Sequence, residues 1–315
     1  MQIVFLVLCL IFALFVVLKS GDLLVESALS ISHNTGIGEQ FIGLTLVSFA
    51  TTAPELFVSC ISATQGRAEM CVNNGLGSII CNIGLILAIS LLFLKQTVNA
   101  KEFNFKGVTL IFVFLILFTF ALNGNISKLE GIILILIYVL FLVISLFSLK
   151  KQNIQYNIKT QINKKELLYS LLTFIIGAVG VAISANLLVN VCVELAQLFK
   201  ISEGIIGLTV LALGTALPEL VSVISAIKKK TLELALGNIV GANIMNATVL
   251  IGLSAILSPQ KLQINMQTKF ITILLCIILN FILVLPILKW RKTFKIQGFA
   301  MLFLFIVYYF LIFLF

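Results

Sequence analysis

The chain has 315 residues, of which 61% are apolar and 10% charged, and its mean hydropathy is +1.19. These values exclude an ordinary soluble domain and indicate a polytopic membrane protein. The net charge of +9 does not indicate nucleic-acid binding, because the basic residues fall in short loops between apolar stretches, without interleaved aromatic residues.

Apolar stretches long enough to cross a bilayer follow one another along the whole chain. They lie at about 2–30, 37–64, 71–94, 107–122, 129–149, 167–198, 203–227, 233–257, 270–288 and 297–315. The first stretch has no basic leader and no small-residue cleavage site, so we expect a membrane helix and not a removable signal peptide. The six cysteines are scattered through these stretches and are expected to be small core residues.

The second half of the chain repeats the first at a constant offset of 164 positions, the difference between 219 and 55. The matched pairs include Gly43 with Gly207, Thr51 with Thr215, Pro54 with Pro218, Glu55 with Glu219, Asn74 with Asn238, Gly77 with Gly241 and Asn82 with Asn246. We therefore expect a first five-helix repeat (1–149), a linker (150–166) and a second five-helix repeat (167–315). Five crossings per repeat insert the second copy upside down relative to the first.

The predicted fold is thus an all-α integral membrane protein with ten transmembrane helices in two inverted repeats, whose glutamate helices are broken at the midplane. Of the 21 Lys and Arg residues, fifteen fall in the loops after helices three, five, seven and nine, and only five in the opposite loops. Positive loops face the cytoplasm. We expect the cell (inner) membrane as location, with both termini outside the cytoplasm, the linker 150–166 inside it, lipid as surroundings and no obligate protein partner.

Each repeat carries one glutamate in the middle of an apolar stretch, Glu55 and Glu219. A charge at the bilayer centre costs about 3 kcal/mol or more and marks a functional site. The proline before each glutamate removes one helical hydrogen bond, so the carbonyl groups of Ala50 and Gly214 lose their partners. Freed carbonyl groups of this kind are tolerated where they face protein or a polar cavity.

Threonine hydroxyls add to these oxygens within one helical turn of the glutamates. The residues concerned are Thr51, Thr52 and Thr215. Oxygen ligands with carboxylates suit hard cations such as calcium and sodium. No basic residue lies in either stretch, so a divalent cation, two monovalent cations or two protons must balance the two charges. Such a substitution at one site is what an exchanger requires.

The helix after each glutamate helix supplies further polar groups, which are Asn74, Ser78 and Asn82 in the first half and Asn238, Asn243 and Asn246 in the second. Amide oxygens can bind a cation or interact with a glutamate. The sequence contains no phosphate-binding glycine loop, so we expect neither ATP use nor a cofactor.

Residues 43–82 and 207–246 resemble the two alpha-repeats of the sodium/calcium exchanger family, in the calcium/cation antiporter superfamily, of the prokaryotic type without a large regulatory loop. The likeness is closest in 77–82, 213–219 and 236–238. It implies a secondary antiporter that exchanges calcium for sodium by alternating access and is not an enzyme. By this resemblance, Glu55, Glu219, Thr51 and Thr215 bind calcium. The expected sites for sodium or another monovalent cation use Ser48, Thr52, Ser78, Asn82, Ala212 and Asn246.

The chain also departs from the family pattern. Ala216 and Ala242 replace serines that sodium-exchanging members usually carry, which leaves the coupling ion open between sodium and the proton. Asn246 replaces the aspartate of potassium-coupled members, so potassium dependence is not expected. Two other classes compete with an antiporter: a cation channel, which needs no counter-ion gradient, and an intramembrane carboxylate enzyme, which is disfavoured because no nucleophile, metal triad or cofactor motif accompanies the glutamates.

Overall fold

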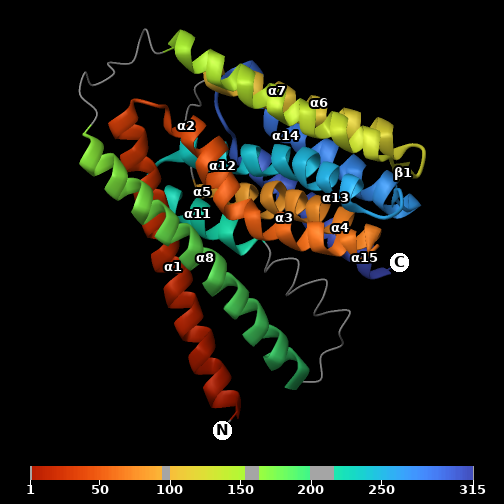
Figure 1. Cartoon of the computed structure of the whole chain (residues 1–315), viewed down its shortest axis with the longest axis horizontal. Coiled ribbons are helices and arrows are strands. Elements are labelled where there is room, and N and C mark those ends of the chain that lie inside the picture. Colours follow the sequence, from red (N-terminus) through yellow and green to blue (C-terminus); the bar gives the residue numbers. More distant parts are fainter. Residues whose placement is uncertain (1, 94–99, 153–162, 199–215, 315) are drawn as a thin grey trace.

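The computed structural model describes residues 2–93, 100–152, 163–198 and 216–314 and is almost wholly helical (Figure 1). Its elements up to residue 152 are α1 (Gln2–Thr35), α2 (Glu39–Ile42), η1 (Gly43–Val47), α3 (Ser48–Thr64), α4 (Ala68–Ile80), η2 (Cys81–Leu87), α5 (Ala88–Phe93), α6 (Ala100–Ala121), β1 (Asn125–Ile126) and α7 (Lys128–Gln152). The later elements are α8 (Lys164–Leu198), α11 (Leu217–Lys228), α12 (Leu232–Met245), η4 (Asn246–Leu250), α13 (Ile251–Leu257), β2 (Leu262–Gln263), η5 (Thr268–Ile273), α14 (Leu274–Trp290) and α15 (Lys295–Leu314).

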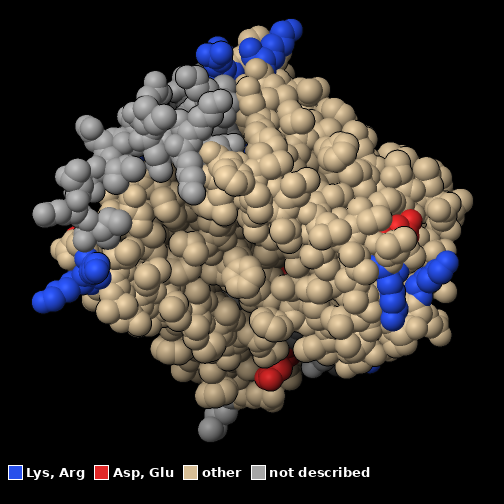
Figure 2. Space-filling model, turned by 45° about the horizontal axis from the view of Figure 1, so that its top comes forward, with Lys and Arg blue, Asp and Glu red and all other residues tan. Residues whose placement is uncertain are grey.

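Within the described residues, eight helical spans are long and apolar enough to cross a membrane, and Lys295–Leu311 forms a shorter apolar helix. Of the expected span 203–227, only the part from residue 216 onward is described. The face shown in Figure 2 is almost free of charge at its centre, with most of its Lys and Arg side chains near the edges. A helical integral membrane protein is therefore confirmed, while the count of ten helices and the inversion of the second half stay predictions.

The buried centre of the molecule consists of the two spans that follow the glutamate helices. In their most apolar parts, 78% of the residues of Met70–Leu92 and 83% of those of Glu233–Leu257 are buried, against 17% in α1. Small residues allow this close packing. A Cβ atom at Gly237 would meet the backbone carbonyl of Gln40, and one at Gly241 would meet that of Leu44. In this way α12 of the second half lies directly against the helix that leads to Glu55.

The predicted break at Pro54 is not observed, because α3 continues through this proline from Ser48 to Thr64. Proline removes one hydrogen bond and can bend a helix without ending it when neighbouring turns stay packed. Irregularity occurs elsewhere, in π-helical segments. The segment η1 precedes α3, and η2 and η4 include Asn82 and Asn246, which are equivalent in the two halves. Such wide turns are frequent at functional sites.

Helices α1 and α8 form a pair of their own, here called the α1–α8 pair. With 34 and 35 residues, each is about 50 Å long, which exceeds the roughly 30 Å of a bilayer core. Their backbones approach closely where Gly177 lies against Leu24. Ser27 donates a hydrogen bond of 2.8 Å to Thr173 of α8. Figure 1 shows the two helices crossing each other, with one end of each projecting beyond the remaining helices.

Two short strands depart from the all-α expectation. Asn125 pairs with Gln263 and Ile126 with Leu262 in an antiparallel ladder that joins a loop of each half. Helix α7 extends to Gln152 and α8 begins at Lys164, so both ends of the expected linker 150–166 are helical. Residues 153–162 between them lie outside the described part of the chain.

Candidate cation-binding site

Both predicted glutamates are fully buried, with 0% of Glu55 and 0% of Glu219 exposed. Glu55 lies within α3, one residue after Pro54. Glu219 lies in the first turn of α11, where Pro218 occupies a position that needs no backbone donor. The positive end of the helix dipole favours a carboxylate in this first turn. The local sequence therefore places one carboxylate inside a helix and the other at a helix start.

One oxygen of each carboxylate accepts a hydrogen bond from a hydroxyl group, and contacts between the halves of the chain are part of both arrangements. Thr52 of α3 donates its hydroxyl to Oε1 of Glu219 at 2.9 Å. Ser78 of α4 donates to Oε1 of Glu55 at 2.7 Å and accepts a bond of 3.2 Å from Nδ2 of Asn246. Residues from both repeats thus meet around the two carboxylates, at the contact between the halves.

The second oxygen of each carboxylate, Oε2, is buried and accepts no hydrogen bond in the described structure. The same holds for the side-chain oxygens Oδ1 of Asn82 and Asn246. An unpaired buried acceptor costs about 1–3 kcal/mol, and more when it is charged, so four of them need an explanation. A hard cation would supply it, because carboxylate and amide oxygens are the ligands that calcium and sodium prefer.

Two equivalent asparagines position the backbone next to the glutamates. Asn74 donates to the backbone carbonyl of Glu55 at 3.3 Å and to the hydroxyl of Ser59 at 2.9 Å. In the second half the link runs through a serine: Asn238 donates to Ser222, whose hydroxyl donates to the carbonyl of Glu219 at 2.9 Å.

Two of the residues in these links were not singled out from the sequence. Ser59 follows Glu55 by four residues and Ser222 follows Glu219 by three, so each lies on the glutamate's face of its helix. A polar residue at that spacing in an apolar helix was the available signal.

Two further contacts join the halves close to the carboxylates. Thr51 donates to Oδ1 of Asn238 at 3.3 Å, and the carbonyl of Ser48 also lies 3.3 Å from the hydroxyl of Thr51. Asn82 donates to Oδ1 of Asn243 at 3.0 Å.

The structure therefore brings together the predicted residues Ser48, Thr51, Thr52, Glu55, Ser78, Asn82, Glu219 and Asn246, all of them buried. The other two predicted residues, Ala212 and Thr215, lie outside the described residues. Ala216 and Ala242 are described and buried, at 3% and 0% exposed, and neither supplies a hydroxyl oxygen.

A helical membrane protein that buries two carboxylates and unpaired amide oxygens where its halves meet belongs to the class of cation transporters. The chain belongs to the sodium/calcium exchanger protein family, whose sequence model matches residues 5–147 and again residues 169–314. Members of this family are transporters and not enzymes, and the chain is an antiporter of this kind.

Relatives cover nearly the whole chain. CaxA of Alkalimonas amylolytica is 31% identical over 300 residues, which are 93% of this chain and 94% of that protein. The sodium/calcium exchanger MaX1 of Methanosarcina acetivorans is 26% identical, over 88% of this chain and 90% of its own length. A solved structure of the sodium-calcium exchanger NCX_Mj, soaked with Na⁺ and Sr²⁺, has a TM-score of 0.86 at 24% identity and covers 97% of this chain and 98% of its own. This similarity confirms the fold.

Proposed function

We propose that the chain exchanges calcium for sodium by binding either ion between Glu55 and Glu219. One observation carries the proposal: each buried carboxylate has one oxygen held by a hydroxyl group and one oxygen with no donor. The unpaired oxygens point to cationic cargo, since two buried negative charges require a counter-charge. One calcium ion or two monovalent cations neutralise the pair equally well, so the ions compete for one site.

Within this proposal, the ligands fall into two groups. Calcium is bound by Glu55, Glu219 and the backbone oxygens of Thr51 and Thr215. Sodium, or another monovalent cation, uses the surrounding groups Ser48, Thr52, Ser78, Asn82, Ala212 and Asn246. The unpaired Oδ1 atoms of Asn82 and Asn246 support this second set. Calcium and sodium are cargo in this scheme, and no cofactor takes part.

The same proposal includes ten helices in two inverted repeats, 1–149 and 167–315, joined by a cytoplasmic linker at 150–166. Three observations support it: the family model matches both halves, the asparagines of η2 and η4 occupy equivalent positions, and each half begins with an unusually long helix. The excess of basic residues in alternate loops supports the inner membrane, with both termini outside the cytoplasm.

Alternating access in this fold requires one part to move past a fixed site. We assign that role to the α1–α8 pair, because its helices bond to each other and much of α1 lies at the surface. Ion occupancy neutralises Glu55 and Glu219 and thereby lets the apolar pair cross the site. With the carboxylates unneutralised, the same movement would bury charge against apolar side chains and is disfavoured.

The test is calcium-45 uptake into proteoliposomes under an outward sodium gradient, an outward proton gradient or no gradient. We expect uptake driven by sodium and its loss in Glu55→Gln and in Glu219→Gln, because each variant leaves a single carboxylate for a divalent ion. Glu166→Gln, at an exposed position at the start of α8, is the matched control and should transport like the parent protein.

Each arm of the experiment separates one alternative. Uptake driven by the proton gradient alone would show that the proton, and not sodium, is the coupling ion. Such a result would agree with the lack of serine hydroxyls at Ala216 and Ala242. Equal uptake under all three conditions would indicate a channel. Undiminished transport by both glutamine variants would remove the site from the proposal.

A further inference from the structure

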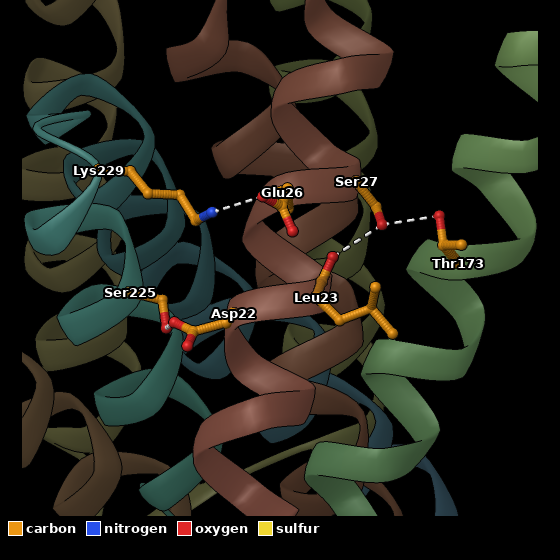
Figure 3. Close-up of polar contacts among 7 residues, drawn as sticks. All are labelled: Asp22, Leu23, Glu26, Ser27, Thr173, Ser225 and Lys229. Carbon is orange, nitrogen blue, oxygen red and sulfur yellow. Dashed lines mark hydrogen bonds and ion pairs between the residues drawn. The ribbon is translucent and has the colours of Figure 1, made fainter.

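A group of four polar residues joins α1 to α11, here called the α1–α11 clamp (Asp22, Glu26, Ser225 and Lys229). Ser225 donates a hydrogen bond of 2.6 Å to Oδ1 of Asp22, and Nζ of Lys229 lies 3.1 Å from Oε1 of Glu26 (Figure 3). Ser225 is 1% exposed, whereas the side chain of Glu26 is 70% exposed. The clamp thus runs from the protein interior to the surface along one face of α1.

The clamp connects the α1–α8 pair to the helix that carries a cargo ligand. Ser225 and Lys229 follow Glu219 by six and ten residues. Ser27, the residue after Glu26 in α1, donates a hydrogen bond to Thr173 of α8, so a displacement of α1 also displaces α8 (Figure 3). Breaking the two clamp contacts is therefore a condition for moving the pair away from α11.

Within the described part of the chain, the equivalent positions of the other repeat make no such contact. By the offset of 164 residues, Asp22 and Glu26 correspond to Asn186 and Asn190 of α8, and Ser225 and Lys229 correspond to Ile61 and Gln65. Asn190 donates to Asn186 at 2.9 Å within its own helix. All four equivalent residues are exposed. The clamp positions therefore form contacts that involve charged groups, whereas the equivalent positions described in the structure do not.

We propose that the α1–α11 clamp biases the transporter toward the state in which the site is closed to the side of Lys229, the cytoplasm. This inference rests on the proposed function, in which the α1–α8 pair moves and the repeats are inverted, so equivalent contacts in the two repeats close the site toward opposite sides of the membrane. If both repeats carried the same contacts, the two states would be balanced. A clamp in one repeat stabilises one state, and its loss shifts the population toward the cytoplasm-facing state.

A bias of this kind changes the apparent calcium affinity measured at each face of the membrane. The apparent dissociation constant at a face rises as the fraction of protein open to that face falls. We would measure half-saturating calcium at each face in proteoliposomes of defined orientation. Glu26→Gln and Lys229→Gln should lower the cytoplasmic value by about two- to fivefold, the range for a partly exposed ion pair. The value at the opposite face should rise.

Two further variants sharpen the test. The double variant Asp22→Asn with Glu26→Gln should give a larger shift, roughly tenfold, because the contact of Asp22 is partly buried and charge-assisted. The charge-swapped double variant Glu26→Lys with Lys229→Glu restores the ion pair and should restore the half-saturating calcium concentrations of the parent protein. Lys228→Gln removes the same charge from the neighbouring exposed position of α11 and should change neither face.

A second readout does not depend on transport. Hydrogen–deuterium exchange of the purified protein should increase around residues 20–28 and 225–231 in the double variant and not in Lys228→Gln. Unchanged affinities at both faces would overturn the proposed bias, whatever the change in hydrogen–deuterium exchange and even if sodium-driven uptake is confirmed. Loss of sodium-driven uptake with increased exchange would instead contradict the proposed function and leave the contact itself established.

Discussion

The hydroxyl of Ser78 connects the two halves of the site. It donates to Glu55 and accepts from Asn246, so it fixes a carboxylate of one repeat relative to an amide of the other. Groups held in place before binding lose little freedom when an ion arrives, which favours affinity. Under the proposed function, Ser78 therefore positions Glu55 and Asn246, in addition to any direct contact that it makes with sodium.

Replacing Ser78 by alanine should raise the half-saturating calcium concentration by roughly tenfold, because hydrogen bonds to charged groups contribute about 1.5–3 kcal/mol. The measurement is calcium-45 exchange at several calcium concentrations. Ser90→Ala is the control, since Ser90 is also buried and bonds only to the carbonyl of Ile86 in its own helical span. Equal calcium dependence of the two variants would show that Ser78 is dispensable.

The residues that carry charge or a hydroxyl next to the glutamates could be predicted from the sequence, because polar groups are rare in apolar helices and stand out. The hydrogen-bond partners of these residues could not be predicted. Thr52 bonds to the glutamate of the other half, Glu219, and not to Glu55 three residues away in its own helix. Such a choice depends on how two helices far apart in the sequence are rotated against each other, which no local spacing determines.

At the scale of elements, α12 is the helix on which the site is assembled. It supplies Asn238 and Asn243, and its glycines allow the backbone of the first glutamate helix to lie against it. The sequence predicted this helix and its polar residues. It did not predict the π-helical segments, because one extra residue in a turn leaves the overall apolar pattern almost unchanged.

Gly241→Ala should lower the thermal unfolding midpoint and weaken calcium binding together, because the added methyl group meets the carbonyl of Leu44 and the hydroxyl of Ser48. Overpacking of this kind costs about 1–3 kcal/mol. The measurement is unfolding in detergent with and without calcium.

Gly75→Ala in α4 is the matched control. There the added methyl group first meets the end of the Leu250 side chain, which can rotate away. A decrease in stability as large as that of Gly241→Ala would show that backbone contact is not the cause.

For the whole molecule, the proposed membrane orientation rests on the charge of the loops. A cysteine in place of Asn123, in the loop before β1, should react with a membrane-impermeant maleimide in intact spheroplasts. A cysteine in place of Lys164, at the start of α8, should react only after lysis. The parent protein, with its own cysteines, gives the background labelling. The reverse pattern would invert the assigned orientation.

The overall architecture could be predicted because its two main signals, hydrophobic length and internal repetition, extend over hundreds of residues. The α1–α11 clamp could not, although its charged residues are visible in the sequence. Asp22 and Glu26 resemble solvated residues near a helix end until Ser225 and Lys229, about 200 positions later, are placed beside them.

The small ladder between Asn125–Ile126 and Leu262–Gln263 has a mechanical consequence. Together with the reciprocal approach of Gly131 in α7 and Gly252 in α13, it fastens the two halves to each other away from the α1–α8 pair. In the proposed cycle, this fastened body is the stator against which the α1–α8 pair moves. Under the proposed function, ion exchange would displace these two helices and leave the arrangement around Glu55 and Glu219 in place.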